Sequence, residues 1–206
     1  MERINLIENK LRKKKETHFI GSWNIKNDNL CKEIISFFDE NKTLQKKGAT
    51  TFGKDYTKKK TTDINIEPND LKNDKFKCFN IYIEELYKCF IDYQLQWPFL
   101  KSIVKDVDIG SFNVQKYSKG DHFSHTHTER DSLHSSNRLF AWMTYLNNVE
   151  DGGTTNFTHY DMKVKPEIGK TLIWPAEWTH AHSGEILNSG VKYIITGWIH
   201  LPYNGD

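Results

Sequence analysis

The sequence has few cysteines, no long apolar run and almost no net charge, and each shortage excludes a class of protein. The three cysteines, Cys31, Cys78 and Cys89, show no C-x-x-C spacing and cannot all pair, so we expect reduced, mostly buried thiols rather than a disulfide scaffold. No apolar stretch approaches the roughly 20 residues that a membrane-spanning helix needs. Residues 1–15 lack the apolar core of a secretion signal, so we expect a cytoplasmic protein with no membrane partner.

The charges of the chain nearly cancel, because 29 basic residues are balanced by 27 acidic ones. No overall field therefore indicates a nucleic acid as partner. Two short lysine-rich runs, at residues 12–15 and 58–60, are interpreted as solvated surface, with docking of an anionic partner as the alternative. The sequence makes no prediction of the oligomeric state.

A change of pattern divides the chain into a helical first part and a strand-rich second part. Asp28 is a candidate N-cap, and apolar residues then recur at helical spacing. A second apolar stripe predicts a helix over residues 75–96, which stops before Pro98. Residues 41–73, between these helices, are rich in Lys, Thr and Asn and are expected to form a long excursion with a short strand or two.

From residue 108 onward, short strand-like runs separated by turns dominate the sequence. The expected strands lie at residues 109–117, 122–129, 137–147, 153–159, 162–165, 170–174, 179–185 and 191–200. This order predicts an α+β, mainly β fold: a double-stranded β-helix, or jelly roll, with bracing amino-terminal helices. We expect a single domain over residues 1–206, with helical support and a variable loop in residues 1–107 and the jelly-roll catalytic core in residues 108–206.

Three residues of the strand-rich part form a metal-binding pattern. His127 and Glu129 stand two residues apart, so on an extended segment both side chains point to the same side. With His182 they supply two imidazoles and one carboxylate, the set that holds Fe(II) on one face and leaves the opposite positions open. His125 shares the face of His127 and is interpreted as lining the pocket. His180 is the alternative to His182 as the third ligand, and would otherwise orient a ligand or the substrate.

The residues around this group carry a family resemblance. The motif YSKG at residues 117–120 precedes the histidines, GGTTNF at residues 152–157 follows them, and Lys192 stands ten residues after His182. In this order and spacing, over about residues 109–201, the chain resembles the iron(II)/2-oxoglutarate dioxygenases of the prolyl 4-hydroxylase type. It also looks like the compact homologues carried by marine bacteriophages, which would place it in a bacterial cytoplasm. The family generally has Asp where this chain has Glu129.

The resemblance implies a chemistry and a set of roles. The implied metal ligands and catalytic residues are His127, Glu129 and His182, which would hold Fe(II). 2-Oxoglutarate would be the co-substrate, with O2 as the oxidant and ascorbate as a candidate reductant. The implied 2-oxoglutarate-binding residues are Tyr117, Tyr145 and Lys192, with Lys192 pairing with the distal carboxylate of 2-oxoglutarate. The implied reaction hydroxylates an unactivated C–H bond, and the expected substrate is proline in a peptide or protein.

Strand parity supports the role of Lys192 independently of the resemblance. Residues 113, 115 and 117 share one strand face, which is polar for a core, and residues 192, 194, 196 and 198 share a face of the last strand. A lysine on such an inward face needs an anion to justify its burial. The pattern therefore predicts a buried carboxylate ligand beside Lys192.

Three alternatives remain open at the level of sequence. A cupin-type metal protein would use His125, His127 and a later His and Glu, but the spacing to the Glu is too short and Lys192 would have no use. A non-catalytic binding module would keep the barrel without the reaction, although all the candidate ligands are present. A 2-oxoglutarate oxygenase with a non-peptide substrate is the third alternative, because residues 41–73 carry no motif that identifies a substrate.

Overall fold

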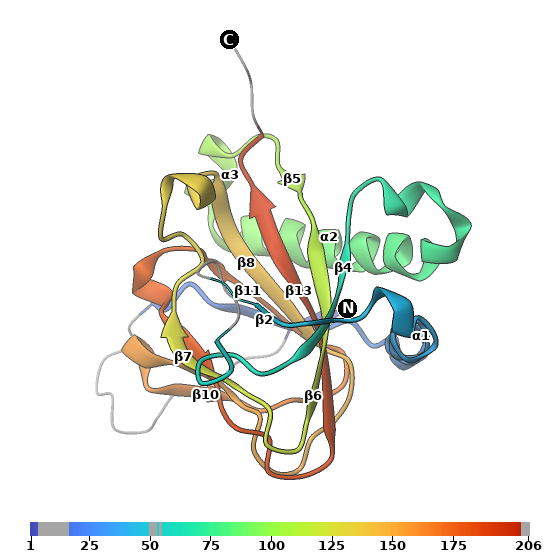
Figure 1. The fold of residues 1–206 in the computed structure, drawn as a ribbon. Coiled ribbons are helices and arrows are strands. Elements are labelled where there is room, and N and C mark those ends of the chain that lie inside the picture. Colours follow the sequence, from blue (N-terminus) through green and yellow to red (C-terminus); the bar gives the residue numbers. More distant parts are fainter. Residues whose placement is uncertain (4–16, 50–52, 54, 203–206) are drawn as a thin grey trace.

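The computed structural model describes residues 1–3, 17–49, 53 and 55–202 as two antiparallel sheets with helices packed against one of them (Figure 1). The helices are α1 (Asp28–Glu40), α2 (Lys77–Gln96) and α3 (Pro98–Ile103). The strands are β1 (Glu2–Arg3), β2 (Gly21–Asn24), β3 (Lys46–Lys47), β4 (Thr62–Ile66), β5 (Asp108–Ile109), β6 (Phe112–Ser118), β7 (Phe123–His127), β8 (Arg138–Tyr145), β9 (Thr155–Phe157), β10 (Met162–Val164), β11 (Lys170–Pro175), β12 (His182–Gly184) and β13 (Val191–His200). The larger sheet has the order β1-β2-β11-β8-β13-β6-β4-β3, with β5 beside β13, and the smaller has the order β10-β9-β12-β7. The predicted double-stranded β-helix with amino-terminal helices is confirmed.

The helices begin and end where local chemistry requires. The side chain of Asn27, not of Asp28, caps α1 by accepting a hydrogen bond from the Leu30 backbone N–H at 3.1 Å, so the predicted cap was wrong by one residue. Asp28 lies in the first turn, where its negative charge suits the helix dipole. Trp97 adopts φ −126° and ψ 77° before Pro98, which ends α2 and begins α3. Among the described residues, no helix is long and apolar enough to span a membrane.

Alternation along β8 separates two apolar cores. Phe140 and Trp142 face α2, whose Tyr82 ring lies 5.6 Å from that of Trp142 between centroids. Ala141, Met143 and Tyr145 belong instead to the cluster inside the barrel. The strand period of two therefore gives the larger sheet one face for the helices and one for the interior.

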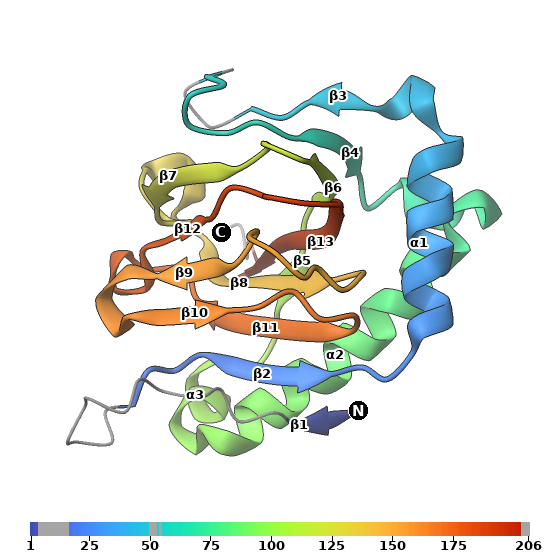
Figure 2. The ribbon, with the colours of Figure 1, turned by 90° about the horizontal axis from the view of Figure 1, so that it is seen from below.

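Residues 41–73 contain β3 and β4, the short strands expected there, and extend the larger sheet at one edge (Figure 2). After β3 the chain runs toward the smaller sheet, where the Lys60 and His122 backbones exchange hydrogen bonds of 2.8 and 3.1 Å just before β7. The segment then returns to the larger sheet as β4. It forms a side wall between the two sheets.

The three cysteines are all free thiols. Cys31 and Cys89 are buried and Cys78 is half-buried. Burial raises the pKa of the Cys31 thiol to about 11 and that of Cys89 to about 12. Such thiols are poor nucleophiles and poor metal ligands, so we assign them a packing role.

Candidate active site

A cavity of about 610 Å³ lies between the two sheets and is closed on one side by the wall that contains β3 and β4. The inward faces predicted from strand parity are those that line it. The lining residues of β6 and β13 are Asn113, Gln115, Tyr117, Lys192, Ile194, Thr196 and Trp198. Met143 of β8 and Trp174 of β11 add apolar surface.

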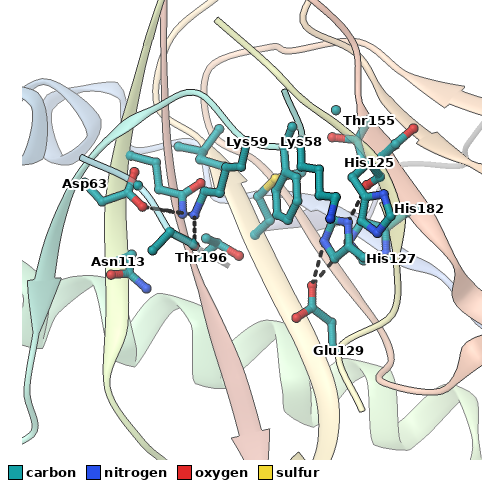
Figure 3. Close-up of a pocket in the computed structure, with 18 of the residues that line it drawn as sticks. Lys58, Lys59, Asp63, Asn113, His125, His127, Glu129, Thr155, His182 and Thr196 are labelled. Atoms are coloured by element: carbon teal, nitrogen blue, oxygen red, sulfur yellow. Dashed lines mark hydrogen bonds and ion pairs between the residues drawn. The ribbon is translucent and has the colours of Figure 1, made fainter. Parts of the chain in front are cut away.

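One end of the cavity brings together His127, Glu129 and His182 (Figure 3). β7 and β12 are antiparallel neighbours, and His127 lies opposite His182 in their register. Glu129 Oε1 lies 3.2 Å from His182 Nε2 and 3.6 Å from His127 Nε2. All three donor atoms lie within 4.8 Å of one another, which suits coordination of a single ion.

Backbone carbonyls orient both imidazoles. The Nδ1 atom of His127 lies 2.9 Å from the His125 carbonyl oxygen, and Nδ1 of His182 lies 2.9 Å from that of His180. A carbonyl only accepts, so each Nδ1 carries a proton, and Nε2 is the nitrogen of each ring that is left to face a metal. Phe123 stacks on the His127 ring with centroids 3.9 Å apart and fixes its plane.

The carboxylate of Glu129 is held on its second oxygen. Trp198 Nε1 donates to Glu129 Oε2 at 2.7 Å, while Oε1 faces the two histidines. Arg138 donates to the Glu129 backbone carbonyl at 2.9 Å, and its guanidinium lies 3.7 Å from the centroid of the Trp198 ring. Burial raises the pKa of Glu129, but hydrogen bonds and charge from His127 and His182 outweigh it and hold the pKa well below its usual range. The Glu129 side chain, which is longer than the Asp usual in the family, is thus ionised and oriented toward the two histidines. The donor set fits Fe(II).

The two alternative histidines lie elsewhere. His180 is buried and points its Nε2 at the His18 carbonyl oxygen, 2.8 Å away, rather than at Glu129. His125 is exposed and lines the cavity, as interpreted, but it is not part of the metal-binding group found among the described residues. The arrangement that a cupin would need, with His125 and His127 on one ion, is therefore absent from the part of the chain that the structure describes.

Lys192 lies inside the cavity with only 2% of its surface exposed. Its Nζ donates to the Gly153 carbonyl at 2.8 Å and lies 4.1 Å from the centroid of the Tyr117 ring. Burial lowers the pKa of Lys192 to about 7, an effect that the negative charge of Glu185 only partly offsets. No carboxylate among the described residues lies within ion-pair distance of it, so an anion in the cavity would stabilise its charged form.

The two tyrosines predicted to bind the co-substrate occupy different places. The ring of Tyr117 lines the cavity, but its hydroxyl donates to Gln115 Oε1 at 2.9 Å. Tyr145 is fully buried behind the lining, and its hydroxyl donates to Thr155 Oγ1 at 2.6 Å. Thr155 itself lines the cavity. Sequence reasoning missed Thr155, because GGTTNF was used only as part of the family motif and Thr155 was assigned no role of its own. The direct roles of both tyrosines stay predictions.

The lysine run at residues 58–60 is not simply solvated, and that interpretation was wrong for Lys59. Lys59 is 6% exposed, and its Nζ donates to Asp63 Oδ2 at 3.0 Å. Gln115 Nε2 donates to the same oxygen at 3.3 Å. The Gln115 hydrogen bond joins the wall to β6, and the Asp63 carboxylate offsets the cost of burying the Lys59 charge. Residues 12–15 lie outside the described residues.

Comparison with known proteins identifies the family. The sequence model of the 2OG-Fe(II) oxygenase superfamily matches residues 112–200, which run from β6 to β13 and contain all three candidate metal ligands. The comparison with curated proteins found no match.

Several solved structures share the fold. A viral collagen prolyl hydroxylase from Paramecium bursaria Chlorella virus-1, in its 2OG complex, has a TM-score of 0.64 at 17% identity, over 89% of this chain and 96% of that one. A Pseudomonas putida prolyl-4-hydroxylase gives 0.66 at 15% identity, over 90% and 94%. A Trichoplax adhaerens prolyl hydroxylase, in complex with a hypoxia inducible factor peptide fragment, gives 0.68 at 14% identity, over 90% and 84%.

Identities this low establish the fold and no more. The family match is separate evidence for the chemistry, because it covers His127, Glu129 and His182. The barrel of this protein, residues 112–200, belongs to the 2OG-Fe(II) oxygenase superfamily of enzymes.

Proposed function

We propose that this enzyme is a prolyl 4-hydroxylase that acts on proline in a peptide or protein and uses Fe(II), 2-oxoglutarate and O2. The observation that carries the proposal is the joint presence, in one cavity, of the His127, Glu129 and His182 donors and of a buried lysine with no carboxylate partner among the described residues. The two histidines and the glutamate suit a ferrous ion, and the buried Lys192 suits one carboxylate of a dicarboxylic acid.

Each group has a definite task in this proposal. His127, Glu129 and His182 would bind the iron on one face, and Lys192 would bind the distal carboxylate of 2-oxoglutarate, with Tyr117 and Thr155 beside it. When bound, the iron and the co-substrate supply the oxidation of an unactivated C–H bond. Trp198 keeps the Glu129 carboxylate in place through its 2.7 Å hydrogen bond. Met143, Trp174 and Ile194 give the cavity apolar surface that limits the access of water.

The peptide substrate is supported by the kind of protein that shares the fold. The viral, bacterial and Trichoplax structures are prolyl hydroxylases, and the last of these contains a bound peptide fragment. In this chain the cavity continues past the metal group to Asn65 and Asn113, whose amides lie side by side on β4 and β6. Amide side chains can both donate to and accept from a peptide backbone.

The test couples co-substrate turnover to product identity. The purified enzyme with Fe(II), 2-oxoglutarate and ascorbate is incubated with a panel of proline-containing peptides, and succinate release is measured. Mass spectrometry of the peptides should show the gain of one oxygen atom, on proline. Glu129→Ala, which removes the carboxylate donor, is the inactive control. Stimulation by a nucleobase, a free amino acid or a sugar, with none by any peptide, would retain the oxygenase and reject the prolyl hydroxylase.

A further inference from the structure

Besides Lys59 and Lys192, four cationic side chains line the cavity and are named here the basic rim: Lys46 and Lys47, which are exposed, and Lys58 and Arg138, which are half-buried. Lys46 and Lys47 form β3, are exposed, and make no ion pair with any described residue. In the β3–β4 register Lys46 lies opposite Asp63, whose side chain lines the cavity, so Lys46 is on the strand face that looks inward.

The other charges of the cavity sum to zero when the proposed iron and co-substrate are bound. Lys59 is neutralised by Asp63 at 3.0 Å. A divalent ion with Glu129, and a dicarboxylate with Lys192, together carry no net charge. The rim cations then remain, with only Asp131 as an anion among the lining residues. Lys58 has a partly exposed partner, Asp55 at 3.3 Å, outside the lining.

This excess of positive charge is local. The chain as a whole carries only +2, so a basic cavity mouth is not a consequence of a basic protein. Clefts lined by charge of one sign concentrate ligands of the opposite sign. The ligand that the basic rim attracts would be the primary substrate, because the charge of the co-substrate is already offset by the iron and Lys192.

The strand edge next to the rim suits a polypeptide. β3 is the last strand of the larger sheet, and no described residue pairs with its outer edge (Figure 2). An open edge offers backbone N–H and C=O groups to an extended chain that adds beside it. A nucleic acid strand would instead call for exposed aromatic rings on which bases stack. The Phe, Tyr and Trp rings of the lining are buried (Tyr117, Trp174) or half-buried (Phe123, Trp198).

We infer that the substrate is an acidic polypeptide segment, with Asp or Glu next to the residue that is hydroxylated, and that Lys46 and Lys47 select it. The inference rests on the proposed function for the nature of the reaction, but the charge preference is a property of the rim itself. Edge lysines also protect sheets from aggregation, and a purely protective role predicts no preference for the charge of a peptide.

The first experiment measures binding without turnover. Three fluorescein-labelled peptides share a central proline and differ in flanks of Asp and Glu, of Ser and Gln, or of Lys and Arg. Fluorescence anisotropy is recorded with the Mn(II)-loaded protein and 2-oxoglutarate. The acidic peptide should bind about tenfold more tightly than the neutral one, since a few exposed ion pairs contribute modestly each. The preference should shrink as salt is raised.

The second experiment changes the rim. The double variant Lys46→Glu/Lys47→Glu should remove the preference for the acidic peptide or reverse it. Lys46→Ser/Lys47→Ser, which adds no repulsion against Asp63, should reduce the ratio of the two affinities to near one. The matched control is Lys101→Glu/Lys105→Glu, which changes two exposed lysines that do not line the cavity and should keep the full preference.

The outcomes separate the two proposals. Equal binding of all three peptides, tightest binding of the basic one, or an unchanged preference in both rim variants would overturn the acidic-substrate inference and leave the prolyl hydroxylase untouched. Preference for the acidic peptide without any oxygen added to it would support the rim and reject the proline reaction. Tighter binding of a single-stranded oligonucleotide than of the acidic peptide would overturn the assignment to a polypeptide.

Discussion

Removal of the Lys192 ammonium should weaken 2-oxoglutarate binding while iron stays in place. Lys192 is buried, and its Nζ has only the Gly153 carbonyl and the Tyr117 ring as contacts among the described residues. Truncating one partner of a buried, charge-assisted contact destabilises the complex by about 2–5 kcal/mol. At ~1.4 kcal/mol per decade, this corresponds to roughly 30-fold to several-thousand-fold in Kd.

Two variants separate charge from packing. Lys192→Ala removes both the charge and most of the side chain, whereas Lys192→Met keeps an unbranched apolar chain against Tyr117. Isothermal titration of 2-oxoglutarate into the Mn(II)-loaded protein gives Kd, and the metal content is determined in parallel. A similar increase in the Kd of 2-oxoglutarate in both variants, with the metal retained, would support a charge contact. An unchanged Kd in both would refute the reasoning and place the co-substrate carboxylate elsewhere.

The lowered pKa of Lys192 gives the same prediction a pH signature. Its pKa is about 7 in the folded protein without ligand, against 10.5 as the ordinary value. The carboxylate binds the protonated form, so Kd should rise as pH increases above about 7 and binding should take up protons. In the unfolded chain Lys192 keeps its proton up to about pH 10.5. Its burial therefore lowers the free energy of unfolding by the full amount below about pH 7. This loss of stability becomes smaller as pH rises from about 7 toward 10.5. Lys192→Met should therefore be more stable than the wild type at pH 7 by an amount on the order of a few kcal/mol, with a smaller gain at high pH.

Three further changes test the metal group and the packing. His127→Ala and Glu129→Ala should each lose stoichiometric Fe(II) or Mn(II), because two remaining donors do not hold a facially bound ion; retention of metal by both would remove the assignment. Trp198→Phe deletes the 2.7 Å hydrogen bond to Glu129 Oε2 and should lower metal affinity about 10- to 100-fold, whereas an unaffected metal Kd would show that the bond does not position the carboxylate. Gly197→Ala should lower the free energy of unfolding by about 1–3 kcal/mol, because a Cβ there would meet Trp142 at 2.7 Å; a chemical denaturation midpoint equal to that of the wild type would contradict this packing.

The approximate positions of the strands along residues 108–200 and the inward faces of β6 and β13 were predictable because both depend on a local period of two. Each inward side chain of a strand is separated from the next by one residue, so a single lysine on that face stands out. For the same reason His127 and Glu129 could be paired from their spacing, and a family motif supplied the distance from His182 to Lys192.

The side wall formed by the segment at residues 41–73 was not predictable in the same way. Its lysines look like ordinary surface in the sequence, and only the tertiary structure shows Lys59 buried against Asp63 and Gln115. The partner on β6 is more than fifty residues away in the sequence, at a position that no period relates to Lys59. Long-range pairing of this kind depends on how the sheets close.

The sequence alone determined the fold class, the donor types and the faces of the strands, since these follow from local alternation and short motifs. The tertiary structure decided which of the two neighbouring histidines faces Glu129, because His180 lies in a short 3-10 turn (Trp178–His180) and contacts His18, whereas His182 begins β12 and faces the carboxylate. It also decided that Trp198 holds the Glu129 carboxylate, that Tyr145 lies behind the lining, and that the four cations of the basic rim line one cavity. Each of these depends on distances between strands that are far apart in the chain, and local sequence patterns do not determine such distances.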